Sequence, residues 1–126
     1  MRSLVAVVVS LIAVQMAPVA AAAVPGELDR SFGSNGTAMV QLPSGRSTTI
    51  AILEDGRIVV GGSSGEASRG RFTLLRFLSS GRLDPSFGIG GVVHAAVSAD
   101  DEADARIDAI VPLPDGGLVA VGTERG

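Results

Sequence analysis

The chain has 126 residues, which is enough for one small domain. Its 10 basic residues, all arginine, stand against 13 acidic ones, and the net charge of −3 excludes the dense basic surface that nucleic-acid binding requires. There is no cysteine, so disulfide bonds and thiolate metal sites are also excluded. With 17 glycines, four phenylalanines and no tryptophan or tyrosine, the core must consist mainly of small aliphatic side chains.

Residues 1–23 have the pattern of a secretory signal peptide. Arg2 gives a positive start, residues 4–14 form an apolar run, and the alanines at 20–23 provide a small-residue exit. We expect cleavage after this tract and export of the remaining chain to the periplasm, the cell surface or the medium, with no membrane association afterwards. An uncleaved anchor over residues 4–24 is the alternative, because that stretch is just long enough to span a bilayer. The glutamine and proline within it favour the signal peptide.

One nine-residue stretch occurs twice in the chain. It reads LDRSFGSNG over residues 28–36 and LDPSFGIGG over residues 83–91, with six of nine positions identical at an offset of 55. Repetition at a fixed period is typical of repeat architectures. We call the two stretches the first and second signature. Their identical positions are Leu28, Asp29, Ser31, Phe32, Gly33 and Gly36 in the first signature, and Leu83, Asp84, Ser86, Phe87, Gly88 and Gly91 in the second.

Each signature is predicted to be a tight turn that joins neighbouring sheets. Asp29 and Asp84 can accept hydrogen bonds from backbone amides a few residues further on, as in Asx turns. The glycines allow positive φ angles that side chains disfavour. Phe32 and Phe87 are the large apolar groups of the signatures, and we expect them to be buried between adjacent sheets.

Short β-strands are expected throughout the rest of the chain. The Asp-Gly pairs Asp55, Gly56 and Asp115, Gly116 lie between apolar runs and predict two hairpin turns. They are 60 residues apart, and the five residues beyond the signature offset fall in the acidic loop around residues 98–105, where an insertion costs little. The predicted strands are residues 37–42, 47–53, 57–62 and 71–78, followed by 91–97, 107–113 and 117–123.

Four short antiparallel strands in each repeat of roughly 40–60 residues are typical of a β-propeller blade. We therefore predict an all-β fold of four-stranded, propeller-like blades in an incomplete set of about two. The repeat region is 24–126, with repeat one over about 28–82 and a truncated repeat two over about 83–126. A seven-stranded β-sandwich that arose by duplication is the alternative. It is disfavoured because sandwiches seldom keep so regular a period.

The chain resembles the delta-60 repeat family. The resemblance is carried by residues 75–88, LRFLSSGRLDPSFG, together with residues 55–62, DGRIVVGG, and it extends over residues 28–126. It implies a bacterial, often exported protein whose repeats form β-propeller blades. The family has no established activity, so it implies no catalytic residues and no cofactor.

The number of repeats is small for such a fold. A blade buries both of its faces only against neighbouring blades, and closed propellers have about 4–8 of them. We therefore expect either that the reading frame is truncated, which the ending inside a blade favours, or that the chain associates with itself into a ring or stack. Further blades or further copies of the chain are thus the expected partners.

Candidates for chemistry are few. Residues 61–65 match the G-x-S-x-G pattern of serine hydrolases, but a polar loop follows in place of a helix. The pattern also needs the chain order serine, acid, histidine, and the only histidine, His94, lies in a predicted strand and precedes Asp100. A glycine-rich loop and a half-exposed strand histidine are the favoured interpretations. Weak candidates for a Ca²⁺ site lack the spacing of a calcium loop, and solvated charges explain them better. They are Asp100, Asp101, Glu102 and Asp104.

The sequence therefore predicts an exported β-repeat module with a structural or binding role. We expect this module to be a fragment of a longer propeller-like protein. No catalytic activity is expected, and the sequence specifies no ligand. The alternative is that the chain forms part of a secreted propeller hydrolase that acts on glycans or lactones.

Overall fold

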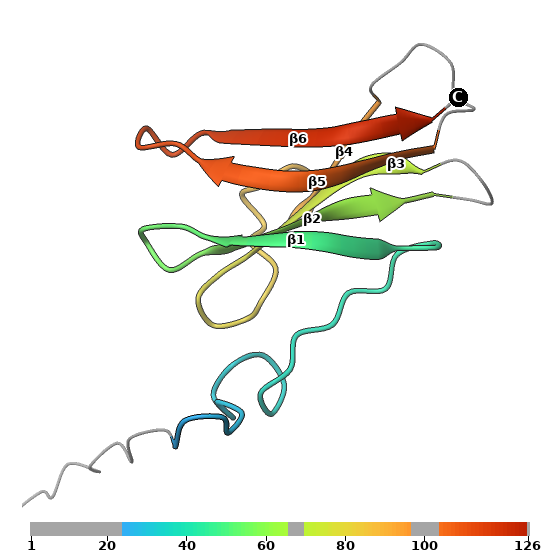
Figure 1. Cartoon of the computed structure of the whole chain (residues 1–126). Coiled ribbons are helices and arrows are strands. Elements are labelled where there is room, and N and C mark those ends of the chain that lie inside the picture. The colour runs from blue at the N-terminus through green and yellow to red at the C-terminus, as the bar shows by residue number, and fades with distance from the viewer. Residues whose placement is uncertain (1–23, 66–69, 97–103, 126) are drawn as a thin grey trace, which may run out of the picture.

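The computed structural model describes residues 24–65, 70–96 and 104–125, and the predicted signal peptide lies outside them. Within these ranges the chain forms two antiparallel β-sheets and no helix (Figure 1). The prediction of an all-β fold with a four-stranded antiparallel sheet is confirmed. The strands are β1 (Arg46–Ile52), β2 (Ile58–Ser64), β3 (Arg71–Phe77), β4 (Val92–Ala95), β5 (Asp104–Pro112) and β6 (Leu118–Arg125).

The two predicted Asp-Gly hairpin turns are present. They join β1 to β2 and β5 to β6, and each aspartate side chain accepts a hydrogen bond from the backbone amide two residues further on. The amide of Arg57 donates over 3.0 Å in the first turn, and the amide of Gly117 donates over 2.8 Å in the second. The glycines of the two turns have φ angles of 81° and 84°, a region that side chains disfavour. The same short sequence therefore gives the same turn twice.

The four-stranded sheet has the order β1-β2-β3-β4 and draws on both repeats. β4 belongs to the second repeat by sequence, yet it pairs antiparallel with β3 of the first, with Val92 opposite Leu75. The second signature, residues 83–91, is the connection between these two strands. The interpretation of the signature as a joint between blades was therefore wrong, because this signature lies inside a sheet.

The predicted strand over residues 37–42 is also absent. This segment forms only isolated bridges at Thr37 and is otherwise outside any sheet. At the repeat offset of 55 it corresponds to β4, which pairs with β3. The residues that would correspond to β3 for this segment are 16–22, which lie outside the described residues. The segment thus has the sequence of a closing strand without a described strand to pair with.

The remaining strands agree with the predictions apart from their ends. β5 begins three residues before the predicted strand, and β6 continues two residues beyond it. Both β1 and β5 carry an irregularity in register at equivalent places, between Ser47 and Thr49 and between Ile107 and Ala109. The β1–β2 and β5–β6 hairpins are therefore copies of each other at an offset of 60.

Side chains alternate between the two faces of the four-stranded sheet. The covered face carries Ala51, Val59 and Gly61 and packs against β5. The opposite face, which we call the open face, lines a cavity. Its apolar residues are Ile50, Ile58, Val60, Leu75 and Phe77.

The packing of β5 onto the covered face depends on the absence of a side chain at Gly61. A Cβ atom built there would lie 2.7 Å from Ile110 Cδ1 and 3.1 Å from Ile107 Cγ2. The isoleucines therefore fill the space that a larger residue would occupy. The Thr48 hydroxyl donates a hydrogen bond to the Ile107 carbonyl and so links β1 of the first sheet to β5 of the second. Ile107 is 1% exposed and Val59 is fully buried.

The fully enclosed part of the core is small. Among the described residues, the hydrophobic side chains classed as buried are Val59, Phe77, Ala105 and Ile107, all at or near the contact between the sheets or on β3. Large hydrophobic residues are exposed on both outer sides of this two-sheet stack. The part of the chain that the structure describes contains no helix long and apolar enough to cross a membrane.

Candidate functional site

The two signatures fold into the same local structure. In each, the serine two residues after the aspartate donates its amide to that carboxylate over 2.9 Å. In each, the phenylalanine carbonyl accepts a hydrogen bond from the amide of the final glycine, over 2.8 Å in the first and 2.9 Å in the second. The first glycine has a φ of 57° in one and 55° in the other. The predicted hydrogen bonds from backbone amides to Asp29 and Asp84 are therefore present.

The second signature has an ion-pair cluster around Asp84, whose side chain is only 5% exposed. Oδ2 lies 2.8 Å from Arg76 Nε and 3.4 Å from Arg57 Nη1, while Oδ1 accepts hydrogen bonds from the Ser86 amide and hydroxyl. These bonds from Ser86, and then those from Arg76, favour the charged carboxylate and lower the pKa of Asp84 to about 2, against the opposing effect of burial. The cluster ties the signature to β3 and to the β1–β2 turn.

The first signature lacks the arginine partners among the described residues. Asp29 is exposed, and the Ser31 hydroxyl and amide lower its pKa. At the offset of 55, the counterpart of Arg76 is position 21, outside the described residues. The aspartate therefore has a local role in the turn in both signatures and a second role, as an ion-pair acceptor, at Asp84.

The two signature phenylalanines are half-buried, so the prediction of burial between adjacent sheets was wrong in degree and in place. The Arg76 guanidinium, on β3, lies over the Phe87 ring, 4.4 Å from its centroid, and Phe87 belongs to the connection between β3 and β4 of the same sheet. Phe32 lines the cavity on the open face. The rings shield the ends of the turns, and a half-exposed ring under a guanidinium gains a cation–π interaction.

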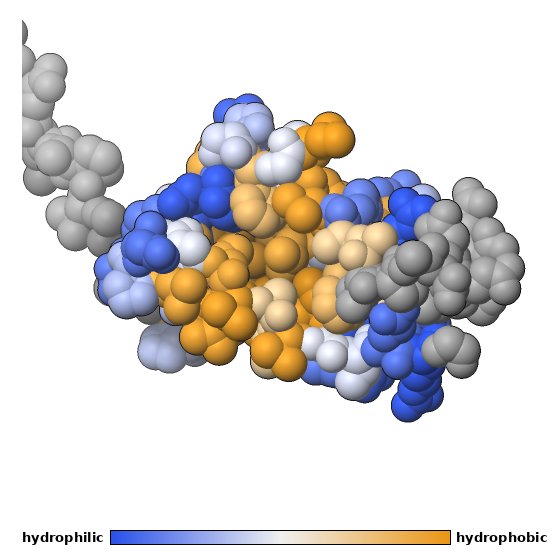
Figure 2. Space-filling view, turned by 90° about the horizontal axis from the view of Figure 1, so that it is seen from above, coloured by the Kyte–Doolittle hydropathy of each residue, from blue (hydrophilic) through white to orange (hydrophobic). Residues whose placement is uncertain are grey.

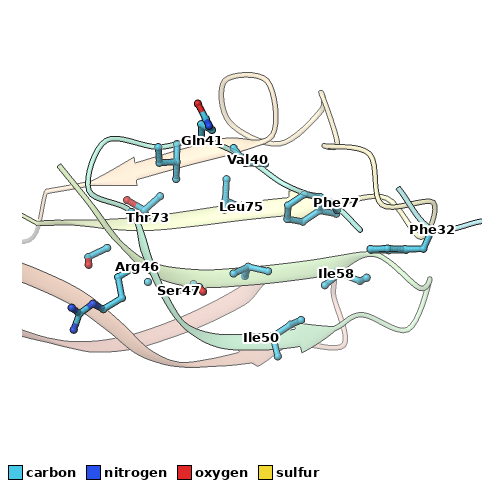
Figure 3. A pocket seen from close by; sticks show the side chains of 17 residues that line it. Phe32, Val40, Gln41, Arg46, Ser47, Ile50, Ile58, Thr73, Leu75 and Phe77 are labelled. Carbon is cyan, nitrogen blue, oxygen red and sulfur yellow. The ribbon is translucent and has the colours of Figure 1, made fainter. Parts of the chain in front are cut away.

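A cavity lies on the open face of the four-stranded sheet. It has a volume of about 620 Å³ and lies between the open face of the four-stranded sheet and the segment of residues 38–47. Figure 3 shows side chains of β1, β2 and β3 on one side of it and Val40 and Gln41 on the other, with Phe32 at one end. Just over half of the lining residues are aliphatic or aromatic, the others are glycine or polar residues, and Arg46 is the charged member. The cavity is suited to apolar side chains more than to a charged ligand.

A polar cluster lies on the open face at the end away from Phe77. The Thr73 hydroxyl is 2.8 Å from the Ser64 hydroxyl and 3.1 Å from His94 Nδ1, and Ser64 lies 3.4 Å from the same nitrogen. The sequence analysis missed this cluster because the three residues are far apart in the chain. The alternation of β2, β3 and β4, once paired in register, brings them together.

This cluster does not have the arrangement of a hydrolase triad. Ser63, the serine of the G-x-S-x-G pattern, belongs to the opposite alternation of β2 from Ser64 and makes no contact with His94. His94 is exposed on β4, whereas the sequence analysis expected it to be half-exposed. Among the described residues, no carboxylate is hydrogen-bonded to its ring. The hydrogen bonds of the cluster instead join β2, β3 and β4 side by side.

Of the weak calcium candidates, Asp100, Asp101 and Glu102 lie outside the described residues. Asp104 is described and is exposed at the start of β5. No group of three or more histidine or acidic residues within the described ranges is placed to hold a metal ion.

A four-stranded antiparallel sheet stacked face to face on a second, equivalent hairpin is the packing expected of successive β-propeller blades. The family described as a domain of unknown function (DUF5122) beta-propeller matches residues 53–87, which span the first hairpin turn, β2, β3 and part of the second signature. No curated protein matches the chain, and no solved structure matches it. The chain therefore contains a β-propeller-type domain for which no specific activity is evident.

Proposed function

We propose that the chain is an exported β-repeat module with a structural or binding role and no catalytic activity, in keeping with its resemblance to the delta-60 repeat. The observation that carries the proposal is the use of the repeated polar residues. The carboxylates of Asp29 and Asp84 accept hydrogen bonds from the serine amide of their own turn. Asp84 also forms ion pairs with Arg76 and Arg57. Asp84 is buried and fully engaged within the fold, so it is not available to a substrate, and Asp29 makes the same hydrogen bonds within its own turn.

The apolar character of the cavity supports the same proposal. Side chains such as Ile50 and Leu75 line it, and the nearby polar cluster is joined by hydrogen bonds between Ser64, Thr73 and His94. General acid–base chemistry needs a titratable pair with matched geometry facing a substrate. A surface that offers apolar contact and little chemistry is suited to holding another protein segment.

An activity screen tests the absence of catalysis. The purified chain is assayed against polysaccharides and lactones beside its His94→Ala variant, because His94 is the one histidine of the chain. We expect no turnover above the uncatalysed rate with either protein. Turnover by the parent chain that is lost in the variant would replace this proposal with the hydrolase alternative.

Export is tested separately. We expect that, when the full chain is expressed in a bacterial host, the secreted or periplasmic product begins near Val24, because the predicted signal peptide is residues 1–23. N-terminal sequencing or intact mass identifies the first residue. A cytoplasmic product that retains Met1 would contradict the proposed export and leave the structural role to be judged on its own evidence.

A further inference from the structure

The two sheets are stacked with unlike faces in contact. β5 and β6 repeat β1 and β2 at an offset of 60, so residues 106–112 and 118–124 of the second sheet have counterparts in the first. At the contact, the covered face of the first sheet, represented by Gly61, receives Ile107 and Ile110 from the second. The counterparts of those two residues are Ser47 and Ile50, which lie on the open face. The contact therefore joins a covered face to the equivalent of an open face.

Both halves of this contact recur on the two outer sides of the stack. The outer side of β5 and β6 is exposed, whereas the open face is exposed at its β1 side and faces the segment of residues 38–47 over the rest. The counterparts of Ala51, Val59 and Gly61 are Val111, Val119 and Val121, which we call the outer face of β5–β6. They are 52%, 44% and 56% exposed. Figure 2, which looks down on the molecule from the side where β6 lies in Figure 1, shows a broad hydrophobic area at its centre.

The open face is the complementary half. Ile50 is 66% exposed and Ile52 is 70% exposed, on the strand that forms one border of the sheet. The cavity of about 620 Å³ continues from Ile50 across β2 to β3. Exposed apolar surface of this kind marks interaction sites. The segment that includes Val40 lies along the cavity and leaves the β1 side accessible.

We propose that the open face of the four-stranded sheet binds the outer face of β5–β6 of a second copy of this chain. The internal contact identifies the occupant. There, the covered face of the four-stranded sheet packs against the equivalent of an open face, and the outer face of β5–β6 is the equivalent of a covered face. The interface would be head-to-tail, since the two surfaces are different. Such interfaces build rings when the rotation closes and filaments when it does not. The inference does not depend on the absence of catalysis.

Charge at the border of the interface is also complementary. The counterpart of Thr48, which contacts Ile107 across the internal interface, is Asp108 on β5. By the same equivalence, Asp108 of one copy lies beside Ser47 and Arg46 of the other. Arg46 is exposed at the border of the cavity. Asp108, whose Oδ1 lies 2.9 Å from Arg106 Nε of its own chain, would therefore have a second arginine beside it. Opposite charges at the border of an interface favour the correct partner and orientation.

The experiment uses two variants that each damage one surface. Val121→Asp places a charge on the outer face, and Ile50→Asp places one on the open face. Ile89→Asp is the matched control, because Ile89 is 91% exposed in the second signature and lies on neither surface. Circular dichroism first establishes that each variant is folded. Val119→Asp replaces Val121→Asp if the latter fails this test, and Ile52→Asp replaces Ile50→Asp.

Sedimentation velocity over a range of concentrations then measures assembly. We expect the parent chain and Ile89→Asp to form species larger than a monomer, and each interface variant alone to be monomeric. An equimolar mixture of Val121→Asp and Ile50→Asp should form a one-to-one dimer, because one intact surface of each kind remains.

Three results would overturn the proposal. One is a parent chain that stays monomeric at every concentration. Another is an Ile50→Asp variant that still self-associates, since this indicates a symmetric contact between two outer faces. The last is a mixture that stays monomeric while the parent assembles, which indicates that the two surfaces do not bind each other. Catalytic assays on the same proteins report on the proposed function independently.

Discussion

Substituting Gly61 tests the packing on which the relation between the two sheets depends. In Gly61→Ala, the new Cβ lies 2.7 Å from Ile110 Cδ1, 3.0 Å from Thr49 Cγ2 and 3.1 Å from Ile107 Cγ2. Overpacking of this kind costs about 1–3 kcal/mol. Replacing glycine by alanine in a strand recovers about 0.4–1 kcal/mol, because the unfolded chain has less freedom to lose. The expected net loss in the free energy of unfolding is about 1–2 kcal/mol.

Thermal unfolding measures this loss. For a domain of 60–100 residues, 1 kcal/mol corresponds to a shift of about 4–8 °C in Tm, so we expect Tm to fall by roughly 4–16 °C. Ile89→Ala is the control, because Ile89 is 91% exposed and lies outside the contact between the sheets, and we expect a change within about 0.5 kcal/mol. If Gly61→Ala melted at the temperature of the parent chain, β5 would not be seated on the covered face as described.

Two further predictions concern the second signature. Phe87→Ala should lower the free energy of unfolding by about 2 kcal/mol, which is below the roughly 3–5 kcal/mol of a core phenylalanine, because the ring is half-buried and part of the loss is its contact with Arg76. Chemical denaturation measures this loss. A value near zero would mean that the ring does not stabilise the contact between the second signature and β3. The pKa of Asp84 is about 2 in the folded chain, against an ordinary value of 3.8. Protonation of this carboxylate therefore favours the unfolded chain. The stability that it contributes is present above about pH 4 and is lost as the pH falls towards about 2. Asp84→Asn should therefore flatten the acid side of the stability profile more than Asp29→Asn does, and equal slopes in both variants would contradict the ion-pair geometry.

Local sequence predicted the turns and most of the strands. The Asp-Gly pairs encode their hairpins within a few residues, and the aspartate and serine of each signature form their hydrogen bonds within the same turn. Strand order was harder to predict. Nothing local distinguishes residues 37–42 from β4, because both follow a signature and both are apolar. What differs is whether a strand such as β3 is available to pair with them.

Contacts between distant residues also escaped the sequence analysis. Arg57 reaches Asp84 from the β1–β2 turn and Arg76 reaches it from β3. Only the register of β2 on β3 brings the two arginines to the same end of the sheet. His94 was expected in a strand, yet its contact with Thr73 depends on β4 being the fourth strand of the first sheet. The alternation of side chains predicts which residues share a face of each hairpin. It does not predict that the hairpins stack, because β5 packs closely only where Gly61 has no side chain.

The position of the second signature between β3 and β4 has a consequence for synthesis on the ribosome. Because β4 comes from the following repeat, the sheet begun by β1 cannot be completed when its own repeat has emerged. Three strands must wait with an unpaired edge until the signature and β4 appear, and such edges are where chains associate wrongly. A chain built this way is expected to depend on elongation rate for its yield, since a pause after β3 prolongs the interval in which that edge is exposed.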